Sequence, residues 1–231
     1  MARLPRLSIP GYPHHLIQRG NNRQPIVADT QDYQVLHQLI AEQAKAAGVE
    51  VHAYALVDTE FHLLATPREA DGLARMMQGI GRRYVRLFNA RTGRTGTLWE
   101  GRYRCALLQA DKFLLACMVE LDLLPVQVGL VDAPSGWAWS SHRHYIGVGT
   151  DRLVTPHPLY WQLGNTPFAR EQAYADRVAQ DLPGSVRRAL VDSAMHGWAL
   201  GDQAFLAALQ KQTGRRLTRA KPGRPRTKPL A

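Results

Sequence analysis

The sequence has few cysteines and few acidic residues, and it contains no long apolar run. Only two cysteines, Cys105 and Cys117, occur among 231 residues, and they form no CxxC pattern. This favours two reduced, packing thiols in a cytosolic protein over a disulfide. No stretch approaches the roughly 18 apolar residues of a membrane span. The opening residues, MARLPRLSIPGYP, lack the apolar segment of a secretory signal. We therefore expect a cytoplasmic protein with no membrane partner.

The shortage of acids leaves the chain strongly basic. Lys and Arg total 29 against 19 Asp and Glu, which gives a formal net charge of +10. A surplus of this size favours a polyanionic partner, with nucleic acid first. The charge is also gathered in two places, which a binding surface requires. Residues 75–104 carry eight arginines and one acid, Glu100, and residues 215–231 carry seven basic residues and no acid.

Strand and helix patterns alternate at the start of the chain. Residues 14–19 predict a strand, and apolar side chains recur at helical spacing between Asp29 and Gly48. Two further strands are expected at residues 49–57 and 60–66. This strand–helix–strand–strand order predicts an α+β fold with an antiparallel sheet.

The segment 69–89 is the clearest helix, because its apolar residues share one side. Arg75, Arg82 and Arg86 fall together on the opposite side, with Gly79 between them. Arginines without interspersed acids favour phosphate binding over a merely solvated face. The glycine would let a phosphate backbone come close to that face.

A basic loop punctuated by glycine, RTGRTGTLWEGRYR, occupies residues 91–104. Trp99 and Tyr103 interleave with its arginines, which suits stacking of unpaired bases while phosphates are neutralised. Burial of both rings in the core is an equally good interpretation. An earlier loop, GNNRQ at residues 20–24, also presents Asn and Arg donors to solvent or phosphate.

Three regions are expected along the chain. Residues 1–150 form a compact domain that includes a helix from Ala110 to Pro125, with Glu120 at the edge of its buried stripe. Residues 151–213 predict a helical C-terminal region, and residues 214–231 are too basic and proline-rich to pack. Within this last arm, Gly223-Arg224-Pro225 resembles the core of an AT-hook, although an unspecific electrostatic arm is the preferred interpretation.

The order of motifs resembles the REP-associated tyrosine transposases, bacterial relatives of single-strand insertion-sequence transposases with the HUH nuclease fold. The matching segments are HHLIQRGNNRQ, VHAYALV with EFHLL, RRYVRLFNARTGRTGTLWEGRYR, LLPVQVGLV, WAWSSHRHYIG and ALGDQAF…GRRLT…KPGRPR. They cover nearly the whole chain in the family's order. The resemblance implies a ferredoxin-like core with an antiparallel sheet and flanking helices. It also implies binding of single-stranded, hairpin-forming REP-like DNA.

The same resemblance identifies the positions at which the family performs its chemistry. A His–hydrophobic–His strand holds Mg or Mn on the scissile phosphate, and a tyrosine on a later helix attacks that phosphate. Here the triplet falls on Glu60-Phe61-His62 and the tyrosine position on Glu120. Family asparagines before the triplet and before Pro125 are replaced by Thr59 and Leu124.

The two replacements have different consequences. Glu60 and His62 can still ligate a hard cation, so binding of Mg or Mn is weakened rather than excluded. Glu120 has no phenol, and its carboxylate places negative charge where a phosphate would be attacked. We therefore expect strand transfer through a phosphotyrosine to be lost, while any other enzymatic activity stays open.

The leading hypothesis is a nucleoid-associated protein, derived from this transposase family, that binds hairpin or single-stranded DNA. The expected contacts are Arg19, Asn22, Arg23, Arg75, Arg82, Arg83, Arg86, Arg94, Trp99, Arg102 and Arg104, with Lys221, Arg224 and Arg226 in the basic arm.

Two alternatives remain. In the first, Glu60, His62 and Glu120 form a metal-dependent nuclease site with water as the nucleophile. In the second, the basic loops bind an RNA hairpin in a regulatory role.

Overall fold

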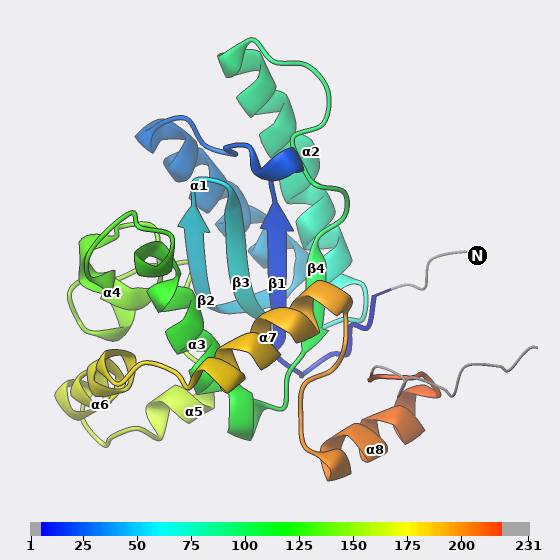
Figure 1. The fold of residues 1–231 in the computed structure, drawn as a ribbon, viewed down its shortest axis with the longest axis vertical. Coiled ribbons are helices and arrows are strands. Elements are labelled where there is room, and N and C mark those ends of the chain that lie inside the picture. Colours follow the sequence, from blue (N-terminus) through cyan, green and yellow to red (C-terminus); the bar gives the residue numbers. More distant parts are fainter. Residues whose placement is uncertain (1–5, 219–231) are drawn as a thin grey trace, which may run out of the picture.

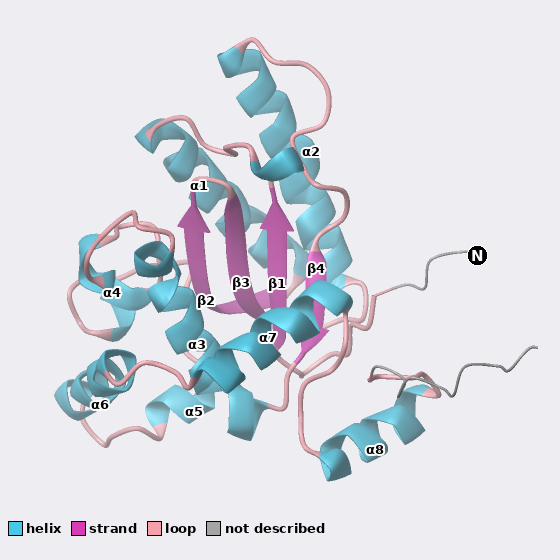
Figure 2. Ribbon diagram, viewed as in Figure 1, coloured by secondary structure: helices cyan, strands magenta, loops and turns pink. Residues whose placement is uncertain are grey.

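The structure is a computed structural model that describes residues 6–218, and a four-stranded antiparallel sheet lies at its centre (Figures 1 and 2). The strands lie in the order β2-β3-β1-β4, and each neighbouring pair is antiparallel. Their bounds are β1 His14–Arg19, β2 Val49–Val57, β3 Glu60–Pro67 and β4 Arg104–Leu107. The predicted α+β class with an antiparallel sheet is confirmed.

Helices cover both faces of the sheet (Figure 1). Helices α1 (Thr30–Ala47) and α2 (Gly72–Thr92) pack together on one face, and α3 (Ala110–Gln127) and α7 (Gly184–His196) pack on the other. The order β1-α1-β2-β3-α2-β4 is that of a ferredoxin-like fold. The other helical segments are η1 Asn21–Arg23, η2 Pro134–Gly136, α4 His142–Tyr145, α5 Pro158–Trp161, α6 Pro167–Ala179 and α8 Gln203–Thr213.

The termini of α1 and α2 follow from local sequence. The Asp29 side chain accepts hydrogen bonds from the first backbone N–H groups of α1, and Gly48, with φ of 65°, ends this helix. Helix α2 runs to Thr92, three residues further than predicted, because its left-handed closing residue is Gly93 with φ of 68°.

Helix α3 also continues past its predicted end at Pro125. Proline lacks an N–H group and therefore removes one helical hydrogen bond. The helix nevertheless extends to Gln127, and the Val128 N–H donates to the Leu124 carbonyl at 3.1 Å. Proline consequently marks the last turn of α3 and not its final residue.

The C-terminal helices share the core of the sheet domain. Rings of Tyr145, Tyr160 and Tyr174 form a cluster with centroid separations of 4.6 to 5.9 Å. Beneath them the fully buried Asp122 carboxylate of α3 accepts hydrogen bonds from the Tyr174 hydroxyl at 2.6 Å and from His142 Nδ1 at 3.0 Å. Helices α4 and α6 are thereby tied to α3.

Both cysteines are free thiols and both are buried, as expected for packing residues. Burial raises the pKa of Cys105 to about 12, which makes its thiol unreactive. Within residues 6–218, no helix has the length and apolar character needed to cross a membrane.

We predict that Tyr174→Phe lowers the free energy of unfolding by about 2 kcal/mol, since the buried Asp122 carboxylate loses a hydrogen bond. Urea denaturation would measure this loss. Tyr12→Phe is a suitable control, because the Tyr12 hydroxyl makes no hydrogen bond to any residue from 6 to 218. Equal stability of the Tyr174→Phe and wild-type proteins would contradict the assigned bond.

Candidate functional site

Glu60 and His62, the predicted metal ligands, lie on the sheet face covered by α3 and α7. On β3, Glu60 and His62 alternate with Phe61 and therefore point to the same face. His62 Nε2 lies 3.3 Å from Glu60 Oε1. On the neighbouring strand β1, Arg19 is paired in register with Glu60, and its Nε donates to Glu60 Oε2.

These contacts hold Glu60 ionised. Burial alone would raise the pKa of Glu60, but His62 and Arg19 outweigh that effect and lower the pKa to about 2. A second imidazole extends the cluster, because His15 Nε2 lies 3.2 Å from His62 Nδ1. Burial, together with the neighbouring His62, lowers the pKa of His15 to about 3, so His15 is neutral at physiological pH.

Glu120, the residue predicted to stand at the family's tyrosine position, is also buried and paired. Glu120, on α3, has only 3% of its surface exposed. Its Oε2 accepts hydrogen bonds from Arg187 Nε of α7 at 2.9 Å and from Gln127 Nε2 at 3.3 Å. Burial raises the pKa of Glu120, and the Arg187 guanidinium offsets this only in part. Arg187 also bridges to Asp181 at 2.5 Å.

The structure places Glu60 and His62 on β3 and Glu120 on α3, the helix that packs on the same sheet face. Among residues 6–218, however, no three His, Cys, Asp or Glu side chains are grouped to hold a metal ion. Both carboxylates already face a guanidinium, Arg19 for Glu60 and Arg187 for Glu120. The donors as arranged do not fit Mg or Mn, and binding of these ions stays an untested prediction.

The exposed side of α2 carries only part of the predicted arginine stripe. Arg82 and Arg86 are exposed, and neither is paired with a carboxylate of the described chain. Arg75 instead bridges to Glu69 at 2.5 Å and to Asp71 at 3.4 Å. Arg83 is paired with Glu42 of α1 at 2.8 Å. The expectation of an arginine stripe free of acids therefore holds for Arg82 and Arg86 and is wrong for Arg75.

The role predicted for Gly79 is also corrected. A Cβ atom on this glycine would lie 1.8 Å from Oε1 of Gln43 on α1. Gly79 therefore faces the neighbouring helix and lets α1 and α2 pack closely, instead of admitting a phosphate backbone.

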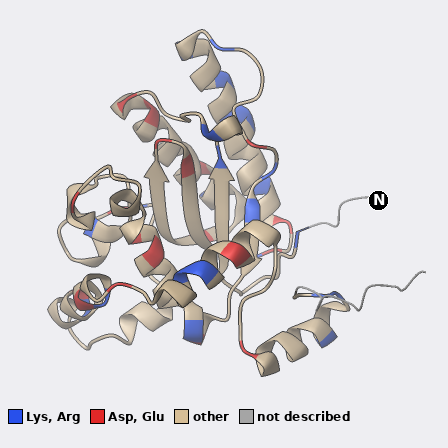
Figure 3. Cartoon of the chain, viewed as in Figure 1, with Lys and Arg blue, Asp and Glu red and all other residues tan. Residues whose placement is uncertain are grey.

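The two predicted basic loops lie side by side at one end of the sheet. The Asn21 N–H donates to the Leu98 carbonyl and the Glu100 N–H to the Arg19 carbonyl, both at 2.8 Å. Arg94 Nη2 donates to Gln24 Oε1 at 2.8 Å across the same junction. In Figure 3, basic residues follow α2, the loop after it and β4. The predicted contacts that these loops gather are Asn22, Arg23, Arg94, Arg102 and Arg104.

The aromatic residues of the 91–104 loop support the core interpretation over base stacking. The Trp99 ring packs against Phe61 and Tyr84, with centroid distances of 5.9 Å to each. Tyr103 is half-buried, and the Arg6 guanidinium lies 3.8 Å from its ring centroid. Trp99 is thus a packing residue whose ring is engaged in the core. The predicted contacts Lys221, Arg224 and Arg226 lie outside the described residues.

Arg187 is the site residue that sequence reasoning missed. The sequence pattern of its segment predicted only a helix. Nothing local in that segment indicates that the helix crosses the sheet above Glu120. Only the tertiary arrangement shows this pairing, because 67 residues separate the two partners.

Residues 9–115 match the model of a family described as "Transposase IS200 like". A solved structure of a REP-associated tyrosine transposase bound to a REP hairpin has the same fold, with a TM-score of 0.52 and 19% identity. That match covers 69% of this chain and 93% of the other. A protein of Deinococcus radiodurans R1 assigned as a transposase matches with a TM-score of 0.37 and 20% identity, over 52% of this chain and 96% of the other. None of the curated proteins matches this sequence.

We predict an asymmetry between the two partners of the Glu120–Arg187 pair. Arg187→Gln leaves a buried carboxylate without its cation and lowers the free energy of unfolding by about 2 kcal/mol. Glu120→Gln costs less than about 1 kcal/mol, because Arg187 keeps Asp181 and partial access to water. Urea denaturation of both variants measures the difference. The difference in free energy of unfolding between Arg187→Gln and wild type shrinks at lower pH, where Glu120 becomes protonated. Equal losses of stability in Arg187→Gln and Glu120→Gln would contradict the pairing.

We also predict that acid destabilises the protein through buried histidines. Burial lowers the pKa of His14 to about 4 and that of His15 to about 3. The unfolded chain therefore binds protons below about pH 6.5 that the folded chain does not. Stability is full above that pH and falls as the pH drops toward 4, by at most about 1.4 kcal/mol per pH unit for each histidine.

Urea denaturation between about pH 7 and pH 5 tests this loss, and His15→Gln should reduce the slope by about one proton. A free energy of unfolding that is constant over this range would contradict the prediction.

Proposed function

We propose that the protein binds hairpin or single-stranded DNA and no longer performs tyrosine-dependent strand transfer, since residues 9–115 match the model of the IS200-like transposase family. The observation that carries this proposal is the set of arginines on α2 and in the two joined loops. It contains Arg82 and Arg86, whose charges have no acidic neighbour among the described residues, and Arg23 and Arg102, which are exposed. Phosphates of a nucleic acid would supply the missing counter-charge.

A REP-like hairpin is the proposed form of the DNA. The structural relative of the same fold was solved with a REP hairpin, which supports this choice. Phosphate contacts would position the hairpin, and the turn residues Asn22 and Arg23, with φ of 53° and 56°, extend from the end of β1 as exposed donors. A DNA-binding protein of this kind would be associated with the nucleoid.

The proposed loss of strand transfer rests on Glu120. A carboxylate at this position offers no phenol for a phosphotyrosine, and its pairing with Arg187 places α7 over it. Tyr84 cannot take the place of that phenol, because its hydroxyl donates to the Ile26 carbonyl at 2.7 Å on the opposite sheet face. The nuclease alternative would need Glu60 and Glu120 to release their arginines to share a cation.

We predict that Arg82→Gln with Arg86→Gln weakens hairpin DNA binding by roughly tenfold or more and reduces the salt slope by about 1.4 to 1.8, since two phosphate contacts are lost. Fluorescence anisotropy across a salt series measures both quantities. The matched control is Arg152→Gln with Arg177→Gln, which removes the same charge from exposed positions away from α2. Affinity that barely changes with salt would reject the proposal, and tighter binding of a matched RNA hairpin would favour the RNA alternative.

A further inference from the structure

One carboxylate stands among the arginines of the 91–104 loop. Residues 75–104 carry eight arginines and a single acid, Glu100. The Glu100 side chain is exposed, and it forms no ion pair with any residue from 6 to 218. Arg19, whose carbonyl accepts the Glu100 N–H, is already paired with Glu60. Glu100 therefore presents an unpaired negative charge at the surface that is proposed to bind DNA.

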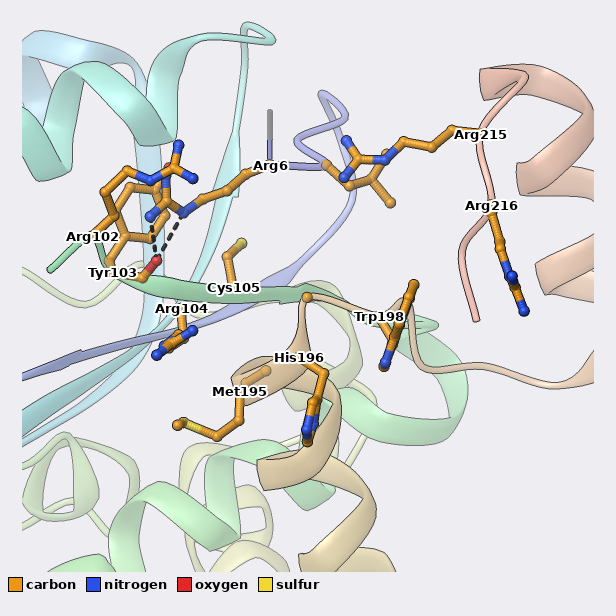
Figure 4. Close-up of a pocket in the computed structure, with 13 residues that line it drawn as sticks. Arg6, Arg102, Tyr103, Arg104, Cys105, Met195, His196, Trp198, Arg215 and Arg216 are labelled. Atoms are coloured by element: carbon orange, nitrogen blue, oxygen red, sulfur yellow. Dashed lines mark hydrogen bonds between the residues drawn. The ribbon is translucent and has the colours of Figure 1, made fainter. Parts of the chain in front are cut away.

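The backbone around Glu100 is anchored on both sides. Its N–H donates to the Arg19 carbonyl at 2.8 Å, and the ring of the preceding residue, Trp99, packs in the core. On the other side, Figure 4 shows Arg6 beside Tyr103, whose carbonyl accepts a hydrogen bond from Arg6 Nε at 2.8 Å. The carboxylate is thus held on a fixed segment, as a group that recognises one particular base must be.

The space beside Glu100 is open. The next residue, Gly101, has φ of 66°, and apart from its chain neighbours no atom of the described residues would lie within 4 Å of a Cβ added there. The exposed donors Asn22, Arg23 and Arg102 belong to the two loops that the Glu100 N–H helps to join. A nucleic acid whose phosphates contact these donors therefore passes the Glu100 carboxylate.

Hydrogen-bond chemistry limits what a carboxylate can contact on DNA. An ionised carboxylate only accepts hydrogen bonds. Phosphate oxygens and the deoxyribose ring oxygen also only accept them, so inside a DNA strand every N–H donor lies on a base. A carboxylate is therefore repelled by the backbone and can be bonded only by a base edge. This favours a role for Glu100 in recognising a base over a role in affinity.

Among the four bases, guanine matches a carboxylate best. Its N1–H and N2–H groups lie side by side on the Watson–Crick edge and can donate to both oxygens of Glu100. Adenine and cytosine each place a ring-nitrogen acceptor beside the amino group, and thymine places a carbonyl on each side of its single N–H. The Watson–Crick edge is accessible only in an unpaired base. An unpaired guanine is therefore the base that fits Glu100.

We propose that Glu100 determines base specificity by accepting hydrogen bonds from the N1–H and N2–H groups of one unpaired guanine in the bound DNA. The inference rests on the proposed DNA binding and deepens it, because it separates the residue that recognises a base from the arginines that contact phosphates. Glu100 contributes discrimination, and it lowers the affinity for DNA that lacks such a guanine.

The test selects DNA hairpins whose unpaired positions are randomised, using the full-length protein and its Glu100→Gln variant. Wild type is expected to enrich guanine at one unpaired position. A glutamine amide has one acceptor and one donor, which match the amino group and ring nitrogen of adenine or cytosine. Glu100→Gln should therefore shift the preference at that position from guanine to adenine or cytosine. Asp132→Asn, which removes the same charge from an exposed acid outside both loops, should keep the guanine preference.

Inosine provides a check at the level of single atoms. Replacing the selected guanine with inosine removes only the N2 amino group, so the affinity of wild type should fall roughly tenfold. The same replacement should leave the affinity of Glu100→Ala nearly unchanged, because alanine accepts no hydrogen bond from the base. Fluorescence anisotropy measures both affinities.

The possible outcomes separate the two proposals. Hairpin binding without a guanine preference at any unpaired position overturns this inference alone. A guanine preference that persists in Glu100→Gln also overturns it, even if the variant binds every sequence more tightly, because the carboxylate then acts only through its charge. Failure of wild type to bind any hairpin or single strand overturns the proposed function and this inference with it.

Discussion

A carboxylate buried beneath a helix needs a positive partner, and this requirement at Glu120 explains how the C-terminal helices pack on the sheet domain. Glu120 is almost fully covered, and Arg187 of α7 supplies the compensating charge. Asp122, two residues further along α3, is buried in the same way and is satisfied by Tyr174 and His142. These two carboxylates explain why the helices of the C-terminal region lie against α3 rather than apart from the sheet domain.

Helix α7 spans the distance between Glu120 and β4. One end of α7 lies over Glu120, and its other end reaches β4. Arg187 at the first end is used for an internal ion pair, while Arg102, just before β4, is exposed.

Most of the sheet domain could be predicted from sequence because its signals are local. The cap at Asp29, the glycines that end α1 and α2, and the alternating strands each depend on neighbouring residues. Interactions between distant segments could not be predicted. The acids that pair with Arg75 and Arg83 come from the turn before α2 and from α1, and neither pair leaves a mark in the α2 pattern. The pairing of Glu120 with Arg187 is another interaction between distant segments that could not be predicted.

The buried pair also restricts which side chains fit at position 120. Tyrosine is larger than glutamate by an aromatic ring, and the space above position 120 is filled by Arg187 and the helix that bears it. A tyrosine introduced at position 120 would therefore overpack the site unless the helix above it moved or changed.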